Sequence, residues 1–166
     1  MILVKDVLNP EKAEKLRQAF IEAEFKQVHQ KTDEYDPEYS CRYQSSIRLA
    51  NTAMFNDCAK EIGRAFMAVS KAECNKASVR AYKMGEGDYF RTHDDARNGR
   101  GFVYYLSKDW QWDWGGILMT QHQGHMIPVI PKFNHLVVVD FCSPHFVTPV
   151  MPYAKEARYA VVGFGK

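Results

Sequence analysis

Long hydrophobic runs are absent from this sequence of 166 residues, and so is any large excess of charge of one sign. No apolar stretch is long enough to cross a bilayer, which argues against a membrane-spanning helix. The only apolar run at the N-terminus is interrupted by Lys5 and Asp6, so we expect no signal peptide. The formal net charge of +2 is too small to indicate a nucleic-acid-binding surface by itself.

Cysteines are few, and no two of them have the short spacing of a zinc knuckle or a disulfide framework. They are Cys41, Cys58, Cys74 and Cys142. We therefore expect an intracellular, cytoplasmic protein in a reducing compartment. Internal repeats and low-complexity segments are also absent. Hydrophobic residues make up 46% and charged residues 25%, which is typical of one globular domain, so we expect residues 1–166 to form a single domain.

The first half of the chain, residues 1–77, is predicted to be a mainly helical support with short strands at 1–7 and 25–29. Asn9 and Pro10 are residues typical of a helix start, and apolar residues follow at helical spacing as far as Ala23. An apolar stripe predicts a second helix over 51–73. Between the helices, residues 31–46 are polar, and they form either a solvated connection or a mobile lid over a site.

After Ser78 the pattern changes to short strands of aromatic and β-branched residues, separated by Gly, Asn, Asp and Pro. The predicted strands are 79–84, 89–95, 102–106, 117–121, 126–130, 136–141, 146–150 and 158–164. A series of strands after two helices predicts a mainly β fold with N-terminal helices. We expect an antiparallel two-sheet barrel of the jelly-roll type over residues 78–166, with the helices against the outside of one sheet.

Polar residues that could bind a metal interrupt these strands. His93 and Asp95 lie two positions apart in a predicted strand, so their side chains point to the same face and can hold one ion. His145 follows the very apolar strand 136–141. Two histidines and one carboxylate form the facial triad of a non-haem Fe(II) centre, which leaves positions open for other ligands.

Arg158 begins the last predicted strand, on the same face as Ala160, Val162 and Phe164. An arginine on the inner face of a barrel is costly unless it meets an anion, and its planar guanidinium suits a carboxylate. A 2-oxo acid bound to the iron would present a distal carboxylate to Arg158, so one hypothesis accounts for all four residues. Each residue alone also has an ordinary structural interpretation: a core or surface histidine at 93, a turn histidine at 145 and a strand-end arginine at 158.

Several segments of the second half occur in the order typical of one family. They are Ala81-Tyr82-Lys83-Met84-Gly85, Gly87-Asp88-Tyr89, His93 with Asp95, Val103-Tyr104-Tyr105-Leu106, Gly115-Gly116-Ile117-Leu118, Pro131-Lys132-Phe133-Asn134, Pro144-His145-Phe146-Val147 and Arg158-Tyr159-Ala160. With these segments the sequence resembles the Fe(II)/2-oxoglutarate-dependent dioxygenases, and within them the prolyl 4-hydroxylase group, especially the oxygen-sensing prolyl hydroxylases. The resemblance covers residues 79–164 and implies a double-stranded β-helix.

The resemblance implies specific roles for five residues. His93, Asp95 and His145 match the iron ligands. Arg158 matches the residue that pairs with the distal carboxylate of 2-oxoglutarate, and Tyr105 matches a tyrosine whose hydroxyl supports the same carboxylate. The implied cofactors and co-substrates are Fe(II), 2-oxoglutarate and O2, with ascorbate as an accessory reductant.

The resemblance also implies a pocket around the 2-oxoglutarate. Tyr82 matches a tyrosine that lines the iron and co-substrate pocket. Val103, Leu118 and Val147 match apolar positions around the 2-oxoglutarate, where exclusion of water protects a reactive oxidant.

The implied reaction is hydroxylation of an unactivated carbon, with release of succinate and CO2, and the favoured target is a prolyl residue of a protein or peptide. A free amino acid, another small molecule or an alkylated nucleic-acid base is the alternative, and the modest net charge argues against the base. A non-catalytic jelly-roll binding module would have the same fold.

For the substrate we expect contacts with Trp110, Arg91 and Phe164. Phe164 stands where the oxygen-sensing enzymes usually carry Trp, and the spacing from His145 to Arg158 is longer than usual. Alternation predicts that Trp110, Trp112 and Trp114 share one face, as a substrate platform or as packing beneath a loop.

Overall fold

The computed structural model describes residues 2–30, 41–72, 79–94, 99–140 and 142–165. Within these residues, eleven strands form one curled sheet in which every pairing between strands is antiparallel. The strands are β1 (Ile2–Val4), β2 (Lys26–Gln30), β3 (Cys41–Ser45), β4 (Arg80–Met84), β5 (Tyr89–His93), β6 (Arg100–Tyr105), β7 (Leu118–His122), β8 (His125–Val129), β9 (His135–Asp140), β10 (His145–Val147) and β11 (Arg158–Gly165).

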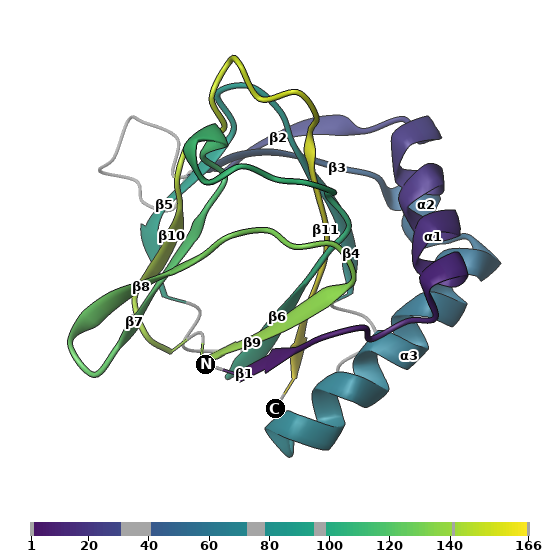
Figure 1. Ribbon diagram of the computed structural model, residues 1–166, viewed down its shortest axis with the longest axis horizontal. Coiled ribbons are helices and arrows are strands. Elements are labelled where there is room, and N and C mark those ends of the chain that lie inside the picture. The colour runs from purple at the N-terminus through teal and green to yellow at the C-terminus, as the bar shows by residue number, and fades with distance from the viewer. Residues whose placement is uncertain (1, 31–40, 73–78, 95–98, 141, 166) are drawn as a thin grey trace.

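The sheet folds over into two facing halves (Figure 1). One half has the strand order β1-β9-β6-β11-β4 and the other has the order β5-β10-β7-β8. β3 connects the halves, because its last residues pair with β4 and its first residues pair with β5, while β2 lies along its other edge. The predicted fold, a two-sheet jelly-roll barrel with N-terminal helices, is therefore confirmed.

The helices lie together on one side of the barrel, outside the half-sheet that contains β11 and β4 (Figure 1). α1 (Pro10–Glu22) begins where the sequence predicts, and the Asn9 side chain accepts a hydrogen bond from the backbone N–H of Glu11. None of the helices in the described part of the chain is long and apolar enough to span a membrane.

The helix predicted over 51–73 is present as α3 (Ala53–Ser70), and a separate short helix, α2 (Ile47–Ala50), precedes it outside the predicted range. Thr52 separates the two, because its hydroxyl caps α3 by accepting a hydrogen bond from the N–H of Phe55. α3 ends at Lys71, which has a left-handed conformation with φ of +58°. A residue in that conformation is a common end of a helix.

Two apolar cores follow from the alternation of side chains along the strands. On β11, Tyr159 and Val161 face the helices, whereas Ala160 and Val162 face the barrel interior. The helix-side core also contains Leu16, Phe20, Phe55, Ile62, Phe66, Phe102, Tyr104 and Val138. The interior core contains Tyr43, Met84, Val103, Tyr105, Leu118, Val137, Val139 and Val147. The same alternation directs Arg158, at the start of β11, into the barrel.

The prediction of a loop over residues 31–46 is wrong for its second part. Residues 41–45 form β3, and Ser46 caps α2 by accepting a hydrogen bond from the N–H of Leu49. Alternation explains the strand, because Cys41 and Tyr43 are buried in the barrel while Arg42 points outward. Residues 31–40, the remainder of the predicted loop or lid, lie outside the described residues.

The predicted strands of the second half are all found, with differences at their ends. The largest difference concerns β10, which was predicted over 146–150 and spans His145–Val147. Pro149 has no N–H to donate to a neighbouring strand, which explains the early end. At its other end, β10 begins one residue earlier than predicted, so His145 lies in the strand and not in the turn before it.

Asn134 fastens the segment before α1 to the barrel. It is buried and has a φ of +58°, a region that Asn tolerates better than most residues. Its Oδ1 accepts hydrogen bonds from the N–H of Leu8 at 3.0 Å and from the hydroxyl of Tyr104 at 2.7 Å, and its Nδ2 donates to the carbonyl of Leu8 at 2.8 Å. One side chain therefore satisfies three buried polar groups.

Replacing Asn134 by Ala should lower the free energy of unfolding by ~2–4 kcal/mol, because buried polar groups lose their partner and Ala is strained at positive φ. Asn134→Gly removes the same hydrogen bonds without that strain, so it should cost ~1 kcal/mol less. Urea unfolding of the three proteins measures both effects. An unchanged unfolding midpoint in Asn134→Ala would contradict the role of this side chain.

Candidate active site

Two histidines from different strands face one another at one end of the barrel. His93 ends β5 and His145 begins β10, and the two residues are direct partners in the antiparallel pairing of these strands. Their ring centroids are 4.3 Å apart and the ring planes are inclined by 54°. His145 is buried, with 3% of its surface exposed, and His93 is half-buried. The structure therefore brings together two of the three predicted iron ligands.

Hydrogen bonds to the backbone fix the tautomer of both rings. The Nδ1 atom of His93 lies 2.7 Å from the carbonyl oxygen of Arg91, and that of His145 lies 3.0 Å from the carbonyl oxygen of Ser143. A carbonyl oxygen can only accept, so Nδ1 carries the hydrogen and the lone pair lies on Nε2. This is the arrangement in which protein histidines bind metals, with the second nitrogen held by an acceptor.

The carboxylate of the predicted triad, Asp95, lies outside the described residues. Its neighbour Asp94 would point to the opposite face of a strand and was therefore not counted in the predicted triad. Asp94 is exposed after the end of β5. The described residues contain no cluster of three or more His, Cys, Asp or Glu side chains that could hold a metal. Of the three residues of the predicted metal centre, the structure therefore describes only the two histidines.

Arg158 is a buried cation with 3% of its surface exposed. Its Nη2 donates to the hydroxyl of Tyr105 at 3.3 Å, its Nη1 lies 3.3 Å from the sulfur of Met84, and its Nε has no hydrogen-bond partner. The guanidinium also lies over the ring of Tyr105, 5.0 Å from the centroid. Among the described residues no carboxylate pairs with it. A buried guanidinium with neutral neighbours is suited to bind an anion.

The hydroxyl of Tyr105 can contribute to the same anion site. Burial raises the pKa of this phenol above its ordinary value, although the nearby Arg158 acts in the opposite direction. The phenol therefore keeps its hydrogen at neutral pH. Because its oxygen accepts from Arg158, the hydrogen remains available to donate to a carboxylate placed between the two side chains.

The walls of this space are apolar and aromatic. Val103, Leu118 and Val147 are buried in the interior core, at the positions predicted to surround the co-substrate. Tyr82 is half-buried, and its ring centroid lies 4.5 Å from that of Tyr43. Tyr43 also stacks on Phe90 at 4.9 Å, and the ring of Phe90 lies 6.0 Å from that of His93. A continuous row of rings therefore leads from β3 to the histidines.

The three residues predicted to contact the substrate occupy different surroundings. Arg91 is exposed on β5, and Phe164 is half-buried at the end of the inner face of β11 that is farthest from Arg158. Trp110 is buried in the interior core, and its indole N–H donates to the carbonyl of Gly115 at 2.9 Å. Trp110 is therefore part of the core and is not a surface platform.

The prediction that three tryptophans share one face is wrong. Trp112–Trp114 form a short 3-10 helix, η2, in which side chains do not alternate as they do in a strand. Trp112 is 71% exposed, whereas Trp110 is buried and meets Trp114 edge to face, with centroids 5.3 Å apart.

Asp88 organises the turn between β4 and β5 and was not singled out from the sequence. Its buried carboxylate accepts from the backbone N–H of Gly85 at 2.8 Å, from the side-chain amides of Gln27 and Gln44 at 3.1 Å each, and from Nε of Arg42 at 3.1 Å. These donors come from β2, β3 and the turn itself. Asp88 thereby fixes the strand that carries His93 to the strand that joins the half-sheets.

A cavity of about 240 Å3 lies beside β7 and the turn before β10. Its lining includes Thr120, which is the direct strand partner of His145, and Ser143, whose carbonyl holds the His145 ring. His122, Asp140 and the β7–β8 turn complete a mainly polar wall. The cavity is therefore near His145 through these two neighbours, although neither His93 nor His145 lines it.

Comparison with known proteins decides the family. Residues 77–166 match the model of the 2OG-Fe(II) oxygenase superfamily, where 2OG is 2-oxoglutarate, and this match covers more than half of the chain. The chain belongs to this superfamily. Its members use Fe(II), 2-oxoglutarate and O2, and the paired histidines and buried arginine of this 2OG-Fe(II) oxygenase are donors of the kinds that such a set requires. No curated protein matches the sequence.

Solved structures share the fold of this oxygenase at low sequence identity. A prolyl-4-hydroxylase from Pseudomonas putida has a TM-score of 0.74 at 19% identity, over 99% of this chain and 91% of that protein. A Trichoplax adhaerens prolyl hydroxylase, solved with a peptide fragment of the oxygen degradation domain of hypoxia inducible factor, has a TM-score of 0.72 at 16% identity, over 99% and 82%. The 2-oxoglutarate-dependent epimerase SnoN from nogalamycin biosynthesis has a TM-score of 0.67 at 11% identity, over 98% and 76%.

Two consecutive glycines keep the loop before β7 close to Arg158. Gly115 and Gly116 have φ of +68° and +62°. A Cβ atom on Gly116 would lie 3.0 Å from Cδ of Arg158, 3.1 Å from Cζ2 of Trp110 and 3.2 Å from Cγ2 of Val150. Gly116 is thus packed closely against both the stem of Arg158 and the ring of Trp110.

Replacing Gly116 by Ala should therefore destabilise the protein through both backbone strain and crowding against Arg158. Gly124 is a matched control, because its φ is +81° and nothing lies within 4 Å of its added Cβ. Gly124→Ala should cost ~1 kcal/mol from strain alone, and Gly116→Ala should cost ~1–3 kcal/mol more from crowding. Denaturant unfolding gives both values, and equal losses would show that the Arg158 stem is not tightly packed.

Proposed function

We propose that this oxygenase hydroxylates an unactivated carbon, with a prolyl residue of a protein or peptide as the favoured substrate. The observation that carries the proposal is the pair of sites along one barrel interior. A histidine pair whose Nδ1 atoms are held by backbone carbonyls lies where β5 and β10 pair, and a buried arginine without a carboxylate partner among the described residues lies at the start of β11. The histidine pair is suited to bind a metal ion, and the arginine is suited to bind a carboxylate of a dicarboxylate ligand.

The metal would be held by His93 and His145 together with Asp95. Neutral imidazole nitrogens and one carboxylate are the donor set of the non-haem Fe(II) facial triad, which leaves coordination positions for a co-substrate and O2. The bonds from Nδ1 of each ring to the backbone carbonyls would orient the rings, with Nε2 left to face the metal.

The distal carboxylate of 2-oxoglutarate would be bound by Arg158 and Tyr105. The guanidinium can form paired hydrogen bonds with a carboxylate, and the phenol adds another donor. Tyr82 would line the pocket between this carboxylate and the iron, where its ring already packs against Tyr43. The co-substrate would therefore be fixed at one end by the metal and at the other by an ion pair.

The apolar walls would keep water out of the reaction. Bound Fe(II), with 2-oxoglutarate and O2, supplies the oxidation that hydroxylates the substrate carbon and releases succinate and CO2. Val103, Leu118 and Val147 surround the co-substrate space with side chains that offer no proton or nucleophile. The chain would therefore bind and orient the iron, the co-substrate and the substrate, and it would exclude water from the pocket.

The substrate would approach through the polar cavity beside His145. Two structures that share the fold are prolyl hydroxylases, and the Trichoplax adhaerens protein was solved with a peptide. Arg91 and Phe164 are the substrate contacts that we retain from the sequence, because both have exposed surface. Trp110 is retained only as a packing residue, since its ring is buried.

The test is incubation of the Fe(II)-loaded protein with proline-containing peptides and 2-oxoglutarate, followed by mass spectrometry for the gain of one oxygen. We expect succinate release coupled to hydroxylation in the wild type. His93→Ala should abolish both with little loss of stability, because the ring is half-buried at a strand end. His125→Ala, on the exposed strand β8 and outside the cavity lining, is a histidine control. Succinate release at the wild-type rate by His93→Ala would refute the metal site, and hydroxylation only of small molecules would replace the prolyl substrate.

Replacing Arg158 by Ala should weaken 2-oxoglutarate binding roughly a hundredfold or more, because removing one partner of a buried ion pair costs ~3–5 kcal/mol. Arg158→Lys should restore only part of the affinity, since lysine keeps the charge but lacks the planar group. Anaerobic titration of each Fe(II)-loaded variant with 2-oxoglutarate gives the dissociation constants. Arg64→Ala, on the exposed face of α3, is the control. Unchanged affinity in Arg158→Ala would remove this residue from the site.

A further inference from the structure

On the side of β11 that faces β6, the backbone beside Arg158 is bridged by the hydroxyl group of Ser107, from the loop after β6, whereas on the other side Arg158 pairs with Met84 of β4. The ladder between β11 and β6 ends at the pair formed by Ala160 and Tyr105. Beyond that pair, Ser107 Oγ accepts a hydrogen bond from the N–H of Tyr159 at 2.9 Å and donates to the carbonyl of Ala157 at 3.2 Å. The bonded groups lie on either side of Arg158, so the hydroxyl bridges the residue at the point where the pairing with β6 stops.

Burial makes this bridge effective. Ser107 has 0% of its surface exposed, so water does not compete for the two hydrogen bonds. The next backbone contact, from the N–H of Leu106 to the carbonyl of Tyr159 at 3.0 Å, holds the same two segments together. The loop after β6 and the pairing with Met84 of β4 therefore together set the direction in which the Arg158 side chain leaves β11.

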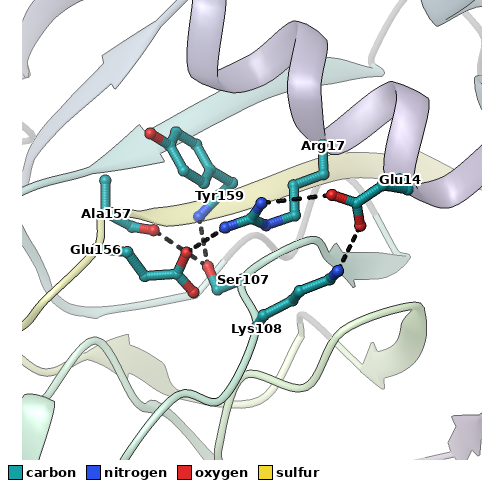
Figure 2. A network of polar contacts seen from close by, with 7 residues as sticks. All are labelled: Glu14, Arg17, Ser107, Lys108, Glu156, Ala157 and Tyr159. Carbon is teal, nitrogen blue, oxygen red and sulfur yellow. Dashed lines mark hydrogen bonds and ion pairs between the residues drawn. The ribbon is translucent and has the colours of Figure 1, made fainter.

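Helix α1 braces both segments that meet at this bridge (Figure 2). Lys108, which follows Ser107, pairs with Glu14 of α1 at 2.6 Å. Arg17, on the same helix, pairs with Glu156 at 2.8 Å and with Glu14 at 3.6 Å. Glu156 precedes Ala157, so one short chain of charges connects α1 to both ends of the hydroxyl bridge.

The side chains of this ion-pair chain are partly shielded from water. The exposed fractions are 17% for Arg17 and 18% for Glu156, whereas Glu14 and Lys108 are more open, at 42% and 43%. Hydrogen bonding to Lys108 holds the pKa of Glu14 below its ordinary value, so the carboxylate stays charged at neutral pH. Salt screens exposed ion pairs more than shielded ones. In the brace formed by the Lys108–Glu14 and Arg17–Glu156 pairs, the Arg17–Glu156 pair is therefore the stronger interaction.

We propose that Ser107 is a positioning residue for the co-substrate and that α1, through Arg17 and Glu156, stabilises the position it sets. This inference rests on the proposed binding of a 2-oxo dicarboxylate by Arg158. It gives the N-terminal helix, which lies outside the matched residues 77–166, a role in co-substrate affinity. Ser107 touches only the backbone beside the arginine, so its effect must pass through Arg158.

The ligand that separates positioning from general stability is 2-oxopentanoate, which has the 2-oxo acid group and the five carbons of 2-oxoglutarate but no distal carboxylate. Loss of the bridge should weaken only the ligand that uses Arg158. Ser107→Ala should weaken 2-oxoglutarate binding about five- to tenfold, the size expected for misplacing one charged contact. Its binding of 2-oxopentanoate and of Co(II) should stay within about twofold of the wild type.

Ser70→Ala is the matched control, because Ser70 is equally buried and its hydroxyl also bonds to the backbone, at Ala72, far along the chain from β11. Both serine variants lose a buried hydroxyl and should lose similar unfolding free energy, but only Ser107→Ala should lose dicarboxylate affinity. Glu156→Gln tests the brace without altering the core, and we expect a two- to fourfold loss with the same ligand selectivity.

The outcomes are distinguishable. Equal weakening of both acids by Ser107→Ala, or no weakening of either, would overturn the positioning role. If Ser107→Ala does not fold, the decision passes to Glu156→Gln, where unchanged dicarboxylate affinity would overturn it. Arg158→Ala is titrated in parallel: unchanged 2-oxoglutarate affinity in that variant would refute the proposed co-substrate site itself, whereas a loss there without a loss in Ser107→Ala would refute only the positioning inference.

Discussion

A guanidinium group held inside a barrel is the constraint on which the rest of this structure depends. The interior around Arg158 is built from apolar and aromatic side chains, and a charge in such surroundings is unfavourable until an anion neutralises it. The fold stabilises the arginine from all sides: a thioether and a phenol contact its end, a glycine packs against its stem, and a serine together with the pairing to β4 fixes its backbone. The unpaired charge is then a source of affinity for a carboxylate ligand.

The same barrel keeps the metal-binding end separate from the anion-binding end. The histidines lie where β5 and β10 pair, while Arg158 lies where β11 leaves its ladder with β6. β3 and the carboxylate of Asp88 fix the half-sheets to each other, so the relative position of the two ends is a property of the strands.

Local patterns in the sequence were sufficient to single out several residues of this candidate site. Alternation placed His93 on the same face as Asp95 and Arg158 on the same face as Ala160, whereas His145 was singled out by its position after the apolar strand 136–141. The cap residues Asn9 and Pro10 likewise predict the start of α1, because their effect is confined to one turn. The helices and the eight later strands were therefore predictable, with errors mainly at their ends.

Other parts of the site could not be predicted, because their partners are distant in the sequence. Asp88 collects donors from residues 61 and 44 positions away, and the partners of Ser107 lie 50 and 52 positions along the chain. β3 was assigned to a loop because its strand is short and polar, and only Cys41 and Tyr43 on its buried face identify it. The three tryptophans were predicted to share one face because strand alternation was assumed for a segment that contains the 3-10 helix η2.

The pairing of His93 with His145 as direct partners in adjacent strands has a further consequence. The separation of the two rings is set by the pairing of β5 with β10, even though the register of this pairing shifts between His145 and Val147. The loops that leave these strands can therefore change in length and composition while the distance between the two histidines stays constant. If these residues bind the metal, substrate contacts made by such loops would diverge at little cost to the metal site.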